Sequence, residues 1–358
     1  MESFDSIVVG GGLAGALLAF SLEQKGHKVV LYSFQQEGES TRVSSGLVNP
    51  VTGMRFVKTW NIEVLLDELV SFYRNIESIL GIEILFETDI VVRLETAAEE
   101  NAWLSRSGED DYKQWISSED VSEEFKHVMI DSLSHGMVRN AWRVDIQGLM
   151  NAVNHYLEAK GIIRNEKFNY TELLAHNTGW LYQKSTYGEH IVFCEGFRIN
   201  ENPFFNWLPV YPLKGEHITV TINEFAIKDV ILGHYTLIPW KNGSYWLGAN
   251  YQVNDIQMGV TSAEKQLQEE FLQQTLTKPF RTMHHDYGIR PASRDRRPMV
   301  GEHPSWKQMY VMNGFGTKGT SLTPYCVSQL INSIIDHSTI STDIDIKRFV
   351  KKGYYKNN

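Results

Sequence analysis

Three glycines near the start of the chain have a spacing that suits the binding of phosphate groups. Gly10, Gly12 and Gly15 form a G-x-G-x-x-G turn directly after the apolar run 7–9. In such a turn the first glycine permits the sharp bend, the second lets the backbone approach a pyrophosphate, and the third lets the next helix lie against the sheet. That helix turns its unsatisfied N–H groups and its positive dipole end toward the phosphates. The motif predicts a dinucleotide site formed by Gly10, Gly12, Leu13, Ala14 and Gly15.

The end of the next apolar run departs from this motif. An acidic side chain that binds a ribose hydroxyl is expected about 20 residues after the turn, and Ser33 stands at that place. A serine hydroxyl still hydrogen-bonds a ribose, but more weakly than a carboxylate does. We expect Ser33 to make this contact, with Glu37 and Glu39 as alternatives.

The residues around the turn predict a complete β-α-β unit. Four leucines recur at helical spacing after the turn, namely Leu13, Leu17, Leu18 and Leu22. Gly26 stands where a glycine commonly ends a helix, and the apolar run 29–31 supplies the second strand. We therefore expect the glycine turn to lie between a buried strand and a helix, as a nucleotide site requires.

The rest of the chain has two different patterns of predicted secondary structure. Helices are predicted over 62–80, from Asp145 to Gly161, from a Thr261/Glu264 capping box to about Lys278, and over 320–335. Alternating runs at 218–222, 230–232 and 245–248, with a turn at 241–243, predict an antiparallel sheet in the second half. Residues 82–140 mix a short strand with acidic, polar stretches, which indicates an inserted region. These two patterns alternate along the chain, which predicts two interleaved structural parts.

The composition narrows the class of protein. The chain has 358 residues, 42% of them hydrophobic, and a formal net charge of −9, so we expect no nucleic-acid partner. Two cysteines exclude a disulfide framework and predict a reducing compartment, the cytoplasm. No run reaches the roughly 18 apolar residues that a membrane span needs. Because the adjacent His284 and His285 project in different directions, we expect no metal site.

Several further segments follow one another in an order typical of a known family. They are Ser44-Ser45-Gly46-Leu47, Cys194-Glu195-Gly196, Pro212-Leu213-Lys214-Gly215-Glu216, Gly288-Ile289-Arg290-Pro291 and Gly314-Phe315-Gly316-Thr317-Lys318-Gly319. With the N-terminal glycine turn they span the whole chain. The ordered set resembles the D-amino-acid oxidase family of FAD-dependent oxidoreductases, which includes glycine oxidase and sarcosine oxidase.

The resemblance implies an α/β (α+β) fold. A Rossmann-like FAD-binding domain of residues 1–81, 141–209 and 286–358 would be interleaved with a substrate-binding domain of residues 82–140 and 210–285, built on a mixed, largely antiparallel sheet. The cofactor would be non-covalent FAD, since neither cysteine stands at the family's covalent position. The expected cofactor-binding residues are Gly10, Gly12, Leu13, Ala14, Gly15, Ser33, Arg42, Ser44, Ser45, Gly46, Leu47, Gly196, Gly314, Gly316, Thr317, Lys318, Gly319 and Thr320.

The resemblance also implies substrate-binding residues. In the family the arginine that corresponds to Arg290 holds the substrate carboxylate, for which a planar guanidinium suits two parallel hydrogen bonds. Lys318 is either a point charge facing substrate and flavin or an ordinary solvated lysine. Thr236 stands where the family often has a pocket tyrosine, and Tyr235 is its neighbour. Both are candidates, although successive strand residues face opposite sides.

The leading functional hypothesis is an enzyme that oxidises the C–N bond of an amino acid or secondary amine, by hydride transfer from Cα to flavin N5. The substrate is expected to be a small molecule, and the electron acceptor is oxygen or another oxidant. One alternative keeps the flavin and acts on a modified tRNA base. Another is a flavin fold that binds without catalysing. The sequence leaves the substrate and the oligomeric state open.

Overall fold

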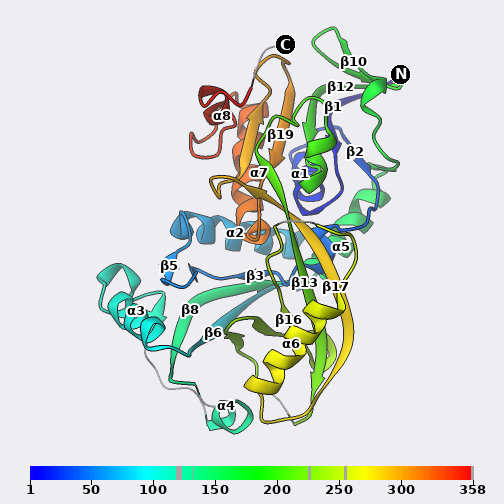
Figure 1. Ribbon diagram of the computed structural model, residues 1–358. Helices are drawn as coiled ribbons and strands as arrows, with labels where there is room; N and C mark the ends of the chain where they lie inside the picture. Colours follow the sequence, from blue (N-terminus) through cyan, green and yellow to red (C-terminus); the bar gives the residue numbers. More distant parts are fainter. Residues whose placement is uncertain (118–122, 131, 225–226, 254–255, 356–358) are drawn as a thin grey trace.

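The computed structural model describes residues 1–117, 123–130, 132–224, 227–253 and 256–355. Two large β-sheets dominate it, one above the other in the view of Figure 1. The glycine turn and the C-terminal helices belong to the upper part. The long strands β13 (Val210–Ile222) and β17 (Phe280–Ser293) run through the lower part.

The upper sheet contains the predicted β-α-β unit. Its strands pair in the order β10-β11-β12-β1-β2-β9, and β19 lies beside β12 with β18 next to it. Their bounds are β1 (Glu2–Val9), β2 (Val29–Ser33), β9 (Ile163–Asn165), β10 (Leu173–His176), β11 (Gly179–Tyr182), β12 (Thr186–Phe193), β18 (Met299–Glu302) and β19 (Met309–Asn313). β1 pairs in parallel with both β2 and β12. The strand expected over 7–9 already begins at Glu2, because Glu2 pairs with Thr186.

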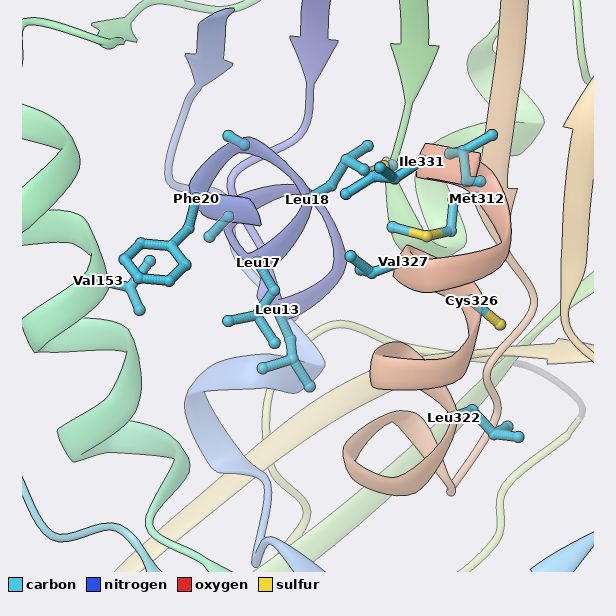
Figure 2. Close-up of a cluster of buried hydrophobic side chains, with 14 of the residues drawn as sticks. Leu13, Leu17, Leu18, Phe20, Val153, Met312, Leu322, Cys326, Val327 and Ile331 are labelled. Atoms are coloured by element: carbon cyan, nitrogen blue, oxygen red, sulfur yellow. The ribbon is translucent and has the colours of Figure 1, made fainter. Parts of the chain in front are cut away.

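Helices pack against this sheet and form its core. They are α1 (Leu13–Gln24), α2 (Ile62–Leu80), α5 (Ile146–Ala159) and α7 (Gly319–Ile335), with the short α8 (Lys347–Lys351) near the C-terminus. Figure 2 shows α1 between α5 and α7, where Phe20 points toward Val153 and Leu18 toward Ile331. Leu17, Leu18 and Leu22 are fully buried, so the leucine spacing predicted the packed side of α1 correctly. This packing fixes the direction in which α1 presents its N-terminus.

The lower sheet is mixed and largely antiparallel, as expected. Its order is β17-β13-β16-β15-β14-β6-β8-β3, with β7 beside β8, and β14 with β6 is its parallel pair among the described strands. Besides β13 and β17 its strands are β3 (Leu47–Val48), β6 (Leu85–Leu94), β7 (Ile116–Ser117), β8 (Ser134–Val144), β14 (Val230–Leu232), β15 (Thr236–Pro239) and β16 (Ser244–Gly248). The hairpin turn expected at 241–243 joins β15 to β16. The α/β class is thereby confirmed.

The remaining elements border the lower sheet. They are α3 (Ala97–Ser107), α4 (Glu123–Val128), α6 (Ser262–Thr275) and the two-stranded ribbon β4 (Val51–Thr52) with β5 (Val57–Lys58). Leu272 of α6 packs in one core with Ile218 and Val220 of β13. This core covers one face of the sheet, and a second core that includes Val92, Ile238 and Trp246 lies on the opposite face. Among the described residues, no helix is long and apolar enough to cross a membrane.

The two sheets draw on interleaved stretches of the chain. Residues between 1 and 33, 163 and 193, and 299 and 313 build the upper sheet, whereas the lower one uses 47–48, 85–144 and 210–293. We propose that they mark the cofactor and substrate domains. Strands β8 and β17 continue past the proposed boundaries after residues 140 and 285.

The start and end of α6 differ from the sequence prediction. The Thr261 hydroxyl does accept a hydrogen bond from the backbone N–H of Glu264, at 3.3 Å. The reciprocal half of the capping box is wrong, because the Thr261 N–H donates to Glu216 at 2.7 Å while Glu264 accepts from the buried Tyr235 hydroxyl at 2.8 Å. The helix ends at Thr275 rather than near Lys278, because Leu276 is extended and forms an antiparallel bridge with Met129.

Candidate active site

One cavity of about 780 Å³ runs from the glycine turn to the face of the lower sheet that lies opposite α6. This volume lies within the range of roughly 300–1,000 Å³ that cofactor and ligand sites occupy. The predicted site residues that line it are Gly10, Gly12, Leu13, Ala14, Ser44, Ser45, Leu47, Gly196, Thr236, Arg290, Gly316, Thr317, Lys318, Gly319 and Thr320. Residues that are far apart in the sequence thus share one wall.

Six predicted site residues do not line the cavity. They are Gly15, Ser33, Arg42, Gly46, Tyr235 and Gly314. Three of them shape the turns beneath it. A Cβ on Gly15 would lie 1.9 Å from the carbonyl oxygen of Gly10, and one on Gly46 would lie 1.9 Å from that of Val144. Gly314 has a φ of +78°, in the left-handed region that favours glycine.

The glycine turn is held in a conformation that other residues do not tolerate. Gly10 has a φ of +105°, and a Cβ there would lie 2.4 Å from the carbonyl oxygen of Cys194. The turn therefore sits directly against the segment that follows β12, which also lines the cavity. Burial raises the pKa of the Cys194 thiol well above its usual value, so this cysteine is an unreactive part of the wall.

Two helices direct their N-termini toward the cavity. Gly12 precedes α1 and Lys318 precedes α7; neither supplies a side-chain cap, and neither helix has an acidic residue in its first turn. In α1 the N–H of Leu13 donates to the Thr41 hydroxyl at 3.1 Å. The other N–H groups and the positive dipole ends favour anionic groups at two places along the cavity.

Ser33 faces the glycine turn rather than the cavity. Its Oγ lies 1.9 Å from the position that a Cβ on Gly11 would occupy. Of the two alternatives, Glu39 lines the cavity, and its carboxylate accepts the backbone N–H of Gln36 at 2.7 Å. Glu37 instead accepts a hydrogen bond from the Tyr287 hydroxyl. Glu39 is therefore the better placed of the two to contact a ribose.

A buried carboxyl group at this end of the cavity was missed from the sequence. Glu195 accepts hydrogen bonds from the Tyr170 hydroxyl at 2.6 Å and from the Asn202 amide at 2.8 Å. Burial outweighs these bonds and raises the pKa of Glu195 to about 7. The available signal was an acidic residue directly after the apolar run 191–194, since the end of a strand beside a glycine turn is seldom exposed to solvent.

Arg290 lies on β17 at the opposite end of the cavity. A Cβ on Gly215 would lie 2.3 Å from a guanidinium nitrogen of Arg290, so the missing side chain of Gly215 provides its space. The guanidinium donates to the backbone oxygen of Asn250 at 3.2 Å and lies 5.2 Å from the ring centroid of Tyr251. Burial lowers the pKa of Arg290, and no described acidic residue pairs with it. An arginine remains protonated in proteins, so this cation is available to an anionic ligand.

Lys318 lies at the start of α7 and contacts hydroxyl groups rather than carboxylates. Its Nζ donates to the hydroxyl of Thr59 at 2.8 Å and to that of Thr52 at 3.3 Å. Burial first, and then the positive charges of Arg297 and Arg296, lower the pKa of Lys318 to about 8. It is thus a partly buried cation in the cavity wall, which favours the point-charge interpretation over a solvated lysine.

Thr236, the first residue of β15, and Tyr235, which directly precedes the strand, face opposite sides of the sheet. Thr236 lines the cavity, whereas Tyr235 packs in the core under α6 and donates its hydroxyl to Glu264. The alternation of strand side chains accounts for this separation. Tyr235 therefore supports the sheet from behind instead of meeting a ligand.

Facing residues of five adjacent strands form the floor of the cavity. Strand pairing aligns Val92 with Leu232, Leu232 with Thr236, Thr236 with Gly248 and Gly248 with His217, and all five line the cavity. His234 and Trp246 border the same floor. Of this set, only Thr236 is a site residue predicted from the sequence.

Comparison with known proteins identifies the family. The sequence matches the family described as DAO, FAD dependent oxidoreductase, over residues 5–330. The chain belongs to this family. It is accordingly a FAD-dependent oxidoreductase, and the expected resemblance is confirmed.

Relatives within and around this family differ in their named activities. Glycine oxidase of Bacillus subtilis is 21% identical, with 95% of each chain covered. The tRNA 5-methylaminomethyl-2-thiouridine biosynthesis bifunctional protein MnmC of Haemophilus ducreyi is 24% identical over 96% of this chain, but the chain spans only 57% of that protein. Glycine oxidase from Geobacillus kaustophilus has a TM-score of 0.81 at 17% identity, covering 98% of both chains. At this identity the structural likeness shows the shared fold.

The cavity of this DAO-family chain fits FAD. The backbone cradle at Gly10 and Gly12, with the N-terminus of α1, suits a pyrophosphate, and the segment around Gly196 closes the same end. The N-terminus of α7 and Lys318 supply positive charge at the end that borders the lower sheet. These residues would hold the nucleotide and the ring system, leaving the floor beside Arg290 for a substrate.

Proposed function

We propose that the protein oxidises the C–N bond of a small amino acid or secondary amine that carries a carboxylate. One observation carries the proposal: the Arg290 guanidinium lies in the cavity wall without a carboxylate partner among the described residues. Leaving a buried cation unpaired is costly, so a site built in this way favours an anionic ligand.

The residues of this chain would bind and orient the substrate. Arg290 would hold the carboxylate through two parallel hydrogen bonds, which fixes the direction of Cα as well as the affinity. Thr236 and the floor of the cavity would limit the size of the substrate, and Lys318 would add positive charge from α7. When bound, FAD supplies the acceptor for the hydride that leaves Cα.

The proposed reaction balances without a side-chain base. The Cα–H bond breaks and its electron pair leaves with the hydrogen, while the amine nitrogen donates its lone pair to form C=N. A primary or secondary amine then loses its N–H proton to water. Water hydrolyses the imine to a carbonyl compound and a free amine. We further propose that FAD is held without a covalent bond.

The test is anaerobic reduction of the purified holoenzyme by glycine, D-alanine, D-proline and sarcosine. We expect at least one of them to bleach the visible flavin bands. Arg290→Lys is expected to keep its FAD and lose about 30-fold in kcat/KM, because a lysine replaces two fixed hydrogen bonds by one mobile charge. Absence of bleaching with every amine, or an unchanged rate in Arg290→Lys, would refute the proposal. If an amine reduces the flavin, oxygen uptake by the reduced protein would show whether oxygen is the electron acceptor.

A second candidate function rests on the likeness to MnmC. An N-carboxymethyl group on a tRNA base would also offer a carboxylate to Arg290. The net charge of −9 opposes RNA docking over a broad surface. Bleaching by tRNA that carries this group, combined with no response to the free amines, would favour this alternative.

A further inference from the structure

His217 lies beside Arg290 on the floor of the cavity. Gly215 and His217 are two residues apart on β13, so they face the same side of the sheet, about 7 Å apart along the strand. The Arg290 guanidinium occupies the space over Gly215. The next side chain on that face is the imidazole of His217, which lines the same cavity. When the carboxylate of a substrate binds Arg290, a substrate atom a few bonds from that carboxylate can therefore contact His217.

The imidazole of His217 is fixed in place but has no polar partner. Its ring stacks on Trp246, with centroids 5.0 Å apart and an angle of 21° between the planes. His217 is only 7% exposed and lines the cavity, and its ring contact among the described residues is the stacking on Trp246, with no hydrogen bond or ion pair from the ring nitrogens. The opposite strand residue is Gly248, where a Cβ would lie only 2.7 Å from the Cβ of His217. Because the ring lines the cavity, a ligand bound there can supply the missing partner.

The imidazole is also neutral. Burial first, and then the charges of His285 and Arg290, lower the pKa of His217 to about 3. A neutral imidazole accepts one hydrogen bond at the nitrogen that lacks a proton. Unlike a carboxylate, it does not strongly favour a positively charged ligand. Oxidation of an amine requires a free lone pair on nitrogen, so a neutral acceptor suits the amine better than an anionic one.

We propose that His217 is a substrate-binding residue that accepts a hydrogen bond from the amino N–H of the substrate while Arg290 holds its carboxylate. This inference rests on the proposed function, because it assigns the second contact of the same substrate. The two contacts together would select compounds in which an N–H lies next to a carboxylate. Carboxylates without an amine would meet Arg290 alone.

The test compares ligands with and without an amine. His217→Phe keeps a ring to stack on Trp246 but removes the acceptor, and His217→Gln keeps an acceptor in a different shape. In the holoenzyme, acetate affinity is measured by perturbation of the flavin spectrum, and the apparent affinity for glycine and sarcosine by anaerobic reduction. We expect His217→Phe to bind acetate within twofold of wild type and the two amines about tenfold more weakly, with partial recovery in His217→Gln.

The outcomes separate this inference from the proposed function. Failure of every amine to reduce the wild-type protein would refute the function and this inference together. Reduction of wild type with unchanged amine affinity in His217→Phe, or an equal loss of acetate affinity, would overturn the inference alone. Wild type itself offers a check that needs no variant. N,N-dimethylglycine has no N–H in its neutral form, so equal affinity for it and for sarcosine would also overturn the inference.

Discussion

The clearest perturbation of the site is Gly215→Ala, which acts on Arg290 without changing that residue. The added Cβ would lie 2.3 Å from Nη2 of Arg290 and 2.6 Å from both Cζ and Nη1. Ordinary contacts of this kind are about 3.5 Å or longer. The guanidinium must therefore move by about 1 Å, and it can do so because it is the end of a flexible side chain.

This displacement predicts a loss of function with little loss of stability. A misplacement of about 1 Å at a positioning group costs on the order of 100-fold in rate, which corresponds to about 2.7 kcal/mol of transition-state stabilisation. Alanine is a better strand residue than glycine, so folding should not suffer. We expect kcat/KM for the best amine to fall about 100-fold, with FAD content and Tm close to wild type.

The assay combines steady-state rates with FAD absorbance and thermal unfolding. Gly108→Ala is the matched control, because its Cβ would lie 3.6 Å from the nearest atom, an ordinary contact, at a residue that does not line the cavity. A Gly215→Ala protein with wild-type kcat/KM would show that Arg290 does not position the substrate. A protein that loses FAD or unfolds would show that Gly215 has a structural role instead.

Two further predictions concern pH. Lys318 has a pKa near 8 in the folded protein, whereas a lysine in the unfolded chain keeps its charge up to about pH 10.4. Acetate affinity should therefore fall above pH 8 in wild type but not in Lys318→Met. Because the unfolded chain binds this proton more tightly, the lysine should also make the stability of the protein rise between about pH 8 and 10.4. Equal pH profiles for acetate binding would contradict this role. Glu195 has a pKa of about 7 in the folded protein, so it binds its proton more tightly there than in the unfolded chain, and stability should fall as the pH rises from about 4.3 to 7. The Tm of Glu195→Gln should depend less on pH over this range. An unchanged slope of Tm against pH in this variant would show that another group causes the effect.

The nucleotide part of the fold could be predicted because its signals are local. The glycine turn, the leucine spacing of α1 and the apolar runs lie within one short stretch of sequence, and each constrains the backbone directly. The cavity places Gly10, Gly12 and Gly196 together, as the ordered motifs implied. Such backbone requirements are visible in residue types alone.

The partners of buried polar groups could not be predicted in the same way. Lys318 meets Thr52 and Thr59 across more than 250 residues of sequence, and Glu195 meets Tyr170 and Asn202 through the packing of separate segments. Their pKa shifts arise from burial, which the sequence does not specify. The capping box at Thr261 failed for the same reason, since tertiary partners replaced the local ones.

Part of the floor of the cavity could be predicted from the sequence. Strand alternation after Gly215 puts His217 on the same face, and alternation separates Tyr235 from Thr236. What the sequence lacked was the strand order and register that place β13 between β17 and β16, with β15 on the far side of β16. Only that register makes His217 a neighbour of Arg290.

The most direct measurement of the central claim is the stoichiometry of a single anaerobic turnover. Holoenzyme is mixed with the most reactive amino acid of the panel, and reduced flavin and the corresponding 2-oxo acid are quantified together. Oxidation at Cα predicts one 2-oxo acid for each flavin reduced, after hydrolysis of the imine. Flavin that stays oxidised, or that is reduced without forming the oxo acid, would contradict the account.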